Sequence, residues 1–170
     1  MSQLRTECLE HNASYAATFA HADLPLPPAK NFAVVACMDA RLNVYAALGI
    51  REGEAHVIRN AGGVVTEDVI RSLVISQRLL GTREVILLHH TDCGMLTFRD
   101  DDVKRQIADQ LGLRPPFALE AFTDLDADVR QSAARIRASA FVPHTDAIHG
   151  FVYEVETGGL RAVDEAAKAS

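Results

Sequence analysis

Short apolar runs, each followed by a polar turn and a helical segment, constrain the fold of this chain more than any other feature. The runs are Phe32 to Cys37, Ala55 to Arg59 and Glu84 to His89. Apolar runs of this length are typical of strands that are buried on both faces, as in parallel sheets. Helices between such strands provide the crossover connections that a parallel sheet needs. The sequence therefore predicts an α/β fold.

Helical periodicity and end signals occupy the intervals between these runs. The clearest helix begins at Thr66, a residue type that caps helix N-termini, and its pattern stops at Gly81. Prolines between Leu24 and Lys30 predict an extended arm, and Gly150 to Val163 predicts a hairpin around Thr-Gly-Gly. The other expected helices are Leu4 to Ala20, Ala40 to Gly49, Asp100 to Leu111 and Asp124 to Ala138. Together these segments predict three layers, with a central, mostly parallel sheet of about four to five strands flanked by helices.

Length and charge limit the partners that we expect. The 170 residues suit one domain with a substantial core, so residues 1–170 are treated as one unit. A formal net charge of -6 argues against a nucleic-acid surface, and the acidic run Asp100 to Asp102 fits the solvated start of a helix. No apolar stretch approaches the roughly 20 residues of a membrane span, and no secretory signal is visible. We therefore expect a cytoplasmic protein that binds neither nucleic acid nor a membrane.

Two polar clusters follow two of the predicted strands. Cys37, Asp39 and Arg41 come at the end of the first strand, and the run His89 to Met95 comes at the end of the third. Sites in open parallel sheets form at the carboxyl ends of strands. We therefore expect these clusters to lie close together, although about fifty residues separate them along the chain.

The thiols and imidazoles in these clusters suggest a metal site. Cys37 and Cys93 with one histidine would leave one position of a tetrahedral zinc ion open, as catalytic zinc sites require. Strand alternation sends His89 and His90 to opposite faces, so only one of them can bind with Cys93, and the spacing does not choose. The alternatives are packing of the cysteines in the core and a Cys37–Cys93 disulfide, which a reducing cytoplasm disfavours. Cys8 is expected to be a packing residue.

Asp39 and Arg41 are the candidate catalytic pair. A carboxylate beside the metal can accept a hydrogen bond from the nucleophile and orient it, and an arginine can hold that carboxylate by a bidentate bond. Asp39 could instead move onto the metal and close the site. The structural alternative is a helix-capping Asp39 with a solvated Arg41.

Three motifs together closely resemble the beta class of carbonic anhydrases. They are Cys-Met-Asp-Ala-Arg at 37–41, Arg-Asn-Ala-Gly-Gly at 59–63 and His-Thr-Asp-Cys-Gly at 90–94. The resemblance covers about Pro28 to Met95, and the context is similar to the short bacterial branch. Many members carry a glutamine before the first strand, which this chain replaces by Pro-Leu-Pro-Pro-Ala-Lys-Asn at 25–31.

The resemblance implies roles for particular residues. The implied zinc ligands are Cys37, His90 and Cys93; the implied dyad is Asp39 and Arg41; the implied substrate-lining segment is Asn60, Ala61, Gly62 and Gly63. In some members the aspartate is a fourth zinc ligand at low pH. The resemblance also implies a homodimer, often paired into a homotetramer, in which residues 1–30 form a helix and arm that pack on the partner subunit.

The leading functional hypothesis is therefore reversible hydration of CO2 to bicarbonate by a metal-bound hydroxide. The same resemblance extends to enzymes that hydrolyse carbonyl sulfide or carbon disulfide at the same kind of zinc site. A third hypothesis is a non-catalytic zinc protein, which would require a fourth protein ligand such as Asp39.

Overall fold

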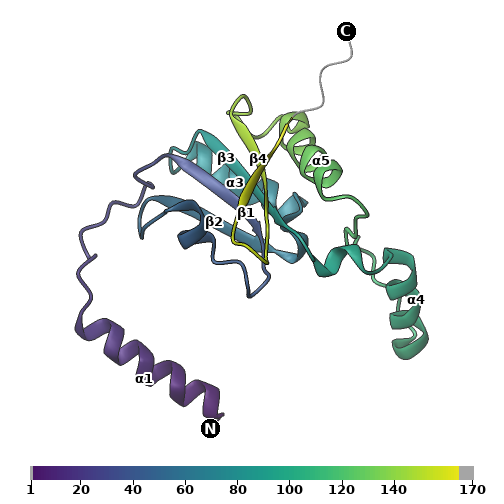
Figure 1. The fold of residues 1–170 in the computed structure, drawn as a ribbon, viewed down its shortest axis with the longest axis horizontal. Helices are drawn as coiled ribbons and strands as arrows, with labels where there is room; N and C mark the ends of the chain where they lie inside the picture. Colours follow the sequence, from purple (N-terminus) through teal and green to yellow (C-terminus); the bar gives the residue numbers. More distant parts are fainter. Residues whose placement is uncertain (1, 165–170) are drawn as a thin grey trace.

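The computed structural model describes residues 2–164, in which a five-stranded sheet carries helices on its flanks (Figure 1). The strands are β1 (Phe32–Cys37), β2 (Ala55–Asn60), β3 (Glu84–His90), β4 (Ile148–Tyr153) and β5 (Leu160–Val163). The helices are α1 (Gln3–Ala17), α2 (Val44–Leu48), α3 (Glu67–Arg78), α4 (Asp100–Leu111) and α5 (Leu125–Ala138), with two short 3-10 helices, η1 (Ala61–Gly63) and η2 (Gly94–Leu96).

The strand order is β2-β1-β3-β4-β5. The pairs β1–β2, β1–β3 and β3–β4 are parallel, and β4–β5 is antiparallel. This confirms the predicted mostly parallel sheet and the predicted C-terminal hairpin. From β1 the chain moves outward to β2 and then returns to place β3 on the other side of β1. The order therefore reverses between β1 and β3, and a topological switch point of this kind is where ligands bind in open α/β sheets.

Alternation along the strands divides the core between the two faces of the sheet. Ala33 and Val35 of β1 pack in a cluster with apolar side chains of α3 and α5. Val34 and Ala36 pack in a second cluster, together with Leu42 and side chains around α2 and η2. Because both faces are covered, β1 is buried from Ala33 to Cys37, which explains its continuous apolar sequence.

Several helix ends agree with the sequence signals. The side chains of Thr66 and Asp124 accept hydrogen bonds from Val69 N–H and Ala127 N–H, so each caps the helix that follows it. Gly112 ends α4 in the left-handed conformation, directly after Leu111, where that helix was expected to end. No helix within residues 2–164 has the length and apolar character that a bilayer crossing requires.

The helix predicted from Ala40 is shorter in the structure. It begins at Val44, and its N-cap is Asn43, whose side chain accepts a hydrogen bond from Ala46 N–H. Asp39 lies in the preceding turn, so its interpretation as a helix cap is wrong. The predicted solvated character of the acidic run also needs correction at Asp100. Its carboxylate accepts hydrogen bonds from three backbone N–H groups at 119–121 and so ties that loop to α4.

Helix α1 stands away from the sheet, to which the extended arm connects it (Figure 1). It has no buried residues, and Leu4 and Leu9 are exposed. Cys8 is also exposed, so its prediction as a packing residue is wrong within this chain. A side-chain hydrogen bond joins the end of α1 to the main body, from the Tyr15 hydroxyl to Glu52 at 2.9 Å. Within residues 2–164, α1 therefore buries none of its apolar side chains.

Candidate metal centre

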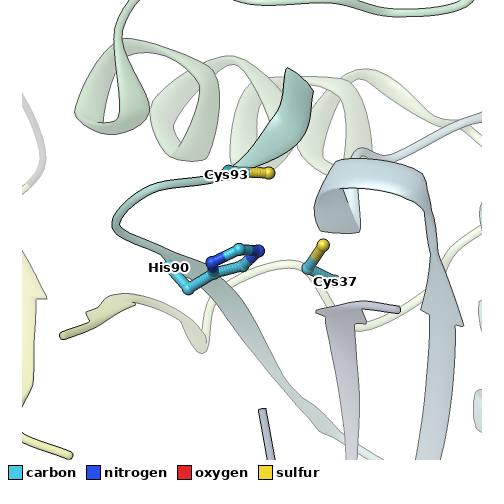
Figure 2. Close-up of side chains that lie close together, drawn as sticks. All are labelled: Cys37, His90 and Cys93. Atoms are coloured by element: carbon cyan, nitrogen blue, oxygen red, sulfur yellow. The ribbon is translucent and has the colours of Figure 1, made fainter. Parts of the chain in front are cut away.

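Three side chains from two distant segments converge at the switch point between β1 and β3. Cys37 ends β1, His90 ends β3, and Cys93 directly precedes η2. Their sulfur and imidazole nitrogen atoms all lie within 4.8 Å of one another, and Figure 2 shows them facing a common space. All three residues are buried. The structure thus brings together the three residues that were predicted as metal ligands.

The orientation of His90 suits metal binding. Its Nδ1 lies 2.8 Å from the carbonyl oxygen of Thr91, which can only accept, so Nδ1 carries the proton. Nε2 is then the atom with a free lone pair. It is buried and has no hydrogen-bond partner among residues 2–164. A buried polar atom without a partner is costly, and a bound cation would remove that cost.

The two thiols interact with each other. A hydrogen bond from Cys93 lowers the pKa of Cys37, and the same interaction raises the pKa of Cys93. The lowered pKa of Cys37 favours its thiolate, which is the form that binds metal. Both cysteines are free, so the alternative of a Cys37–Cys93 disulfide is not what the structure shows.

His89 faces the opposite side of the sheet. Its Nε2 donates to the carboxylate of Asp128 in α5 at 2.7 Å, and its ring lies 5.5 Å from the ring of Phe122. His89 is fully buried, and it is not a member of the Cys37–His90–Cys93 cluster. The alternation that separated the two histidines in the sequence is confirmed.

Asp39 and Arg41 form a bidentate pair beside the cluster. Arg41 Nε and Nη2 donate to the two carboxylate oxygens of Asp39 at 3.0 and 2.8 Å, and the Arg41 backbone N–H adds a third bond. These hydrogen bonds hold the pKa of Asp39 well below its usual range. Asp39 Oδ2 lies 3.7 Å from His90 Nε2, so the carboxylate is next to the atoms that face the common space.

Arg59 supports the backbone of this site, a role that the sequence analysis did not assign. Its Nε donates to the carbonyl oxygen of Cys37 at 2.9 Å, and its Nη2 donates to that of Asp39 at 2.7 Å. Arg59 pairs with Ala36 in the β1–β2 register, which places its side chain beside the end of β1. Two signals in the sequence mark Arg59: it is an arginine at the end of an apolar strand, and it begins the Arg-Asn-Ala-Gly-Gly motif at 59–63.

The segment Asn60–Gly63 packs against the end of β1. A Cβ on Gly63 would lie 2.8 Å from the backbone nitrogen of Cys37, and Gly63 has a positive φ of 72°. Glycine is therefore required there by close packing as well as by backbone conformation. The Asn60 amide donates to Val64 O at 2.8 Å, while its buried Oδ1 has no partner within residues 2–164.

The donor set fits a divalent transition metal. Two thiols and one imidazole nitrogen, close together and buried, are ligands that zinc prefers, and three protein ligands leave a fourth position open. The fold and the cluster therefore define an α/β protein with three donors that could hold a metal ion, at the carboxyl ends of β1 and β3.

Comparison with known proteins places this protein in a family. A family model described as carbonic anhydrase matches residues 32–114. Beta-carbonic anhydrase 1 of Mycobacterium tuberculosis is 62% identical over 155 residues, which cover 91% of this chain and 94% of that protein. The chain belongs to the beta-carbonic anhydrase family.

Two further relatives show the range of the family. The crystal structure of carbonic anhydrase from Streptococcus mutans has a TM-score of 0.88 and 42% identity, and the match covers 96% of this chain and 99% of that one. A carbon disulfide hydrolase of Acidithiobacillus thiooxidans is 35% identical over 156 residues, which cover 80% of this chain and 78% of that protein. Relatives with two different names therefore share this fold.

Proposed function

We propose that this protein catalyses the reversible hydration of CO2 to bicarbonate, with zinc bound by Cys37, His90 and Cys93. The observation that carries the proposal is the convergence of these three buried donors beside a carboxylate that an arginine holds in place. The 62% identity to proteins named beta-carbonic anhydrase 1 supports CO2 as the substrate.

Zinc in this cluster would lower the pKa of a coordinated water and so supply the nucleophile for CO2. The chain's own residues provide the orientation. Asp39 can accept a hydrogen bond from the nucleophile, because its Oδ2 lies 3.7 Å from His90 Nε2 at the edge of the cluster. Arg41 orients the Asp39 carboxylate by hydrogen bonds, and Arg59 holds the backbone of Asp39 by a hydrogen bond to its carbonyl oxygen. We assign Asn60, Ala61, Gly62 and Gly63 to the wall of the substrate site.

The test is stopped-flow CO2 hydration by zinc-loaded protein at pH 7 and pH 9. We expect activity well above buffer at pH 9, and an Asp39→Ala variant should lose turnover while it retains stoichiometric metal. The control is protein from which the metal has been removed by a chelator, which should be inactive. A zinc-loaded protein that is inactive at both pH values overturns the proposal.

Carbonyl sulfide and carbon disulfide are the second candidate substrates. The relatives named carbon disulfide hydrolase, at 35% identity over 80% of this chain, favour this alternative. Each molecule is a linear triatomic whose carbon can be attacked in the same way, so the same donors and the same carboxylate would serve. Sulfide release measured beside CO2 hydration, on one zinc-loaded preparation, discriminates between the two activities.

We also propose that the protein is a homo-oligomer in which α1 packs on a second copy. The exposed apolar side chains of α1 and its separation from the sheet support this arrangement. Deletion of residues 1–30 should convert a dimer or tetramer to monomers in light-scattering measurements at micromolar concentration. An unchanged mass would contradict the proposed role of α1 in oligomerisation.

A cytoplasmic location is also proposed, because two adjacent free thiols suit a reducing compartment.

A further inference from the structure

Asp92 lies in the sequence between the proposed ligands His90 and Cys93. It contacts Arg41, which belongs to the other segment of the site. Its carboxylate accepts a hydrogen bond from Arg41 Nη1 at 2.7 Å, and its carbonyl oxygen accepts one from Arg41 Nη2 at 3.1 Å. We propose that Asp92 is a positioning residue that anchors Arg41, so that the Asp39 carboxylate stays bound to Arg41 and does not move onto the metal. This inference rests on the proposed function, in which Asp39 orients the nucleophile.

The guanidinium of Arg41 is held at both ends. Nε and Nη2 donate to Asp39, while Nη1 and Nη2 donate to Asp92. Four of its five N–H groups therefore have partners, and the two partners come from segments more than fifty residues apart. Without the Asp92 side chain, Asp39 would be the single side-chain partner of the guanidinium. The Arg41 side chain could then rotate into solvent, either together with the Asp39 carboxylate or after releasing it.

Asp39 has a second position within reach. Its Oδ2 lies 3.7 Å from His90 Nε2, the ligand atom that faces the common space. A small rotation of the carboxylate would bring it to the fourth position of a metal held there, in competition with water or another ligand. The bonds from Arg41 oppose that rotation, so the site stays open only while Arg41 stays where it is.

The strength of the anchor sets the size of the expected effect. The side chains of Asp92 and Arg41 are 76% and 48% exposed, so water and salt weaken their attraction. A pair of this kind shifts an equilibrium by a factor of about three. The backbone at Asp92 has a positive φ of 53°, which glycine and asparagine tolerate, so both substitutions preserve the turn.

The test measures access to the fourth metal position without turnover. Cobalt replaces zinc, because its visible spectrum reports its ligands, and azide is titrated as a competing ligand. In Asp92→Gly we expect apparent azide affinity to fall by up to about threefold, because Asp39 occupies the metal in a larger fraction of molecules. Removal of a negative charge beside the site would by itself raise the affinity for an anion, so the expected direction excludes a simple charge effect.

A double-mutant cycle then separates positioning from a general disturbance. In an Asp39→Ala background there is no carboxylate to close the site, so Asp92→Gly should leave azide affinity the same or slightly higher. Asp92→Asn keeps an acceptor oxygen, so its azide affinity should lie between those of wild type and Asp92→Gly. Asp102→Asn in α4, which also removes one exposed carboxylate paired with an arginine, is the matched control and should not change azide affinity.

Two results would overturn the inference. One is an azide affinity in Asp92→Gly equal to or above that of wild type; the other is an equal fall with and without Asp39. If the glycine variant does not take up cobalt, Asp92→Asn carries the same cycle, with a smaller fall in azide affinity expected than for Asp92→Gly. Failure of the proposed function looks different: zinc-loaded wild type would then lack CO2 hydration, while the azide titrations would still report on Asp92.

Discussion

His89 and His90 are neighbours in the chain, yet they serve opposite faces of the sheet. His89 points toward α5, where Asp128 satisfies one of its nitrogens inside the core. His90 points toward the cluster of Cys37 and Cys93, and its Nε2 has no partner within residues 2–164. Both side chains are fully buried. Each ring has one buried nitrogen without a partner within residues 2–164, so neither burial nor a free lone pair identifies a ligand; what distinguishes His90 is the two cysteine donors beside that nitrogen.

The largest effect should follow removal of His90. His90→Ala leaves two thiols, and loss of a ligand should weaken zinc binding by more than about 100-fold, since even residues that only support a ligand cost 10–100-fold. Metal analysis after dialysis should show less than one zinc ion per ten chains, and CO2 hydration should fall with it. Far-UV circular dichroism serves as the control for folding. Full zinc retention would mean that the ligand assignment is wrong.

His89→Ala should produce the converse result. It leaves the Asp128 carboxylate buried without its partner, so the free energy of unfolding should fall by about 3 kcal/mol. Zinc content in the folded protein should stay at one per chain. Denaturant unfolding of His89→Ala, Asp128→Asn and the double variant measures the coupling between the two side chains. Loss of zinc from folded His89→Ala would show that the two faces are not independent.

Substitution of two glycines, Gly63 beside Cys37 and Gly150 beside α5, compares the two faces of the sheet again. A Cβ at Gly63 would press on the backbone of Cys37, and Gly63 also has a positive φ. A Cβ at Gly150 of β4 would press on the side chain of Val129 in α5 and not on backbone. We expect Gly63→Ala to cost about 2–3 kcal/mol and to weaken metal binding, and Gly150→Ala to cost about 1–2 kcal/mol with metal binding intact. Thermal unfolding and zinc titration check both; equal effects on metal binding would contradict the comparison.

The smallest effect concerns a partly exposed ion pair between Asp126 of α5 and Arg161 of β5. Hydrogen bonds from Arg161 in β5 lower the pKa of Asp126. The folded pKa is below the unfolded value of about 3.9, so this stabilisation is present above pH 4 and is lost as pH falls toward the folded pKa. Because both side chains are partly exposed, wild type should lose less than about 1 kcal/mol more than Asp126→Asn between pH 6 and pH 3. Denaturant midpoints at several pH values measure this. A larger difference would mean that this partly exposed pair stabilises the fold on the scale that we assign to the buried pair of His89 and Asp128.

Local signals in the sequence were sufficient for the elements of the fold. The apolar run from Phe32 to Cys37 matched β1 residue for residue, and Thr66 and Asp124 capped the helices that they were expected to begin. These features depend on side-chain period and on bonds between residues three apart. The helix expected from Ala40 failed because the turn at Asp39 is held by contacts with Arg59, twenty residues away.

The sequence by itself determined that the two histidines face opposite ways, since alternation along a strand is local, and that the ends of β1 and β3 carry the donors. It named Cys37, Asp39, Arg41 and Cys93 as candidates, and the family resemblance selected His90. Only the tertiary structure decided that Asp128 pairs with His89, that Arg59 and Asp92 both hold the segment from Cys37 to Arg41, and that α1 buries none of its side chains against the rest of residues 2–164. The physical reason is that these contacts join residues far apart in the chain, and the pattern within one strand or helix carries no information about what lies across from it.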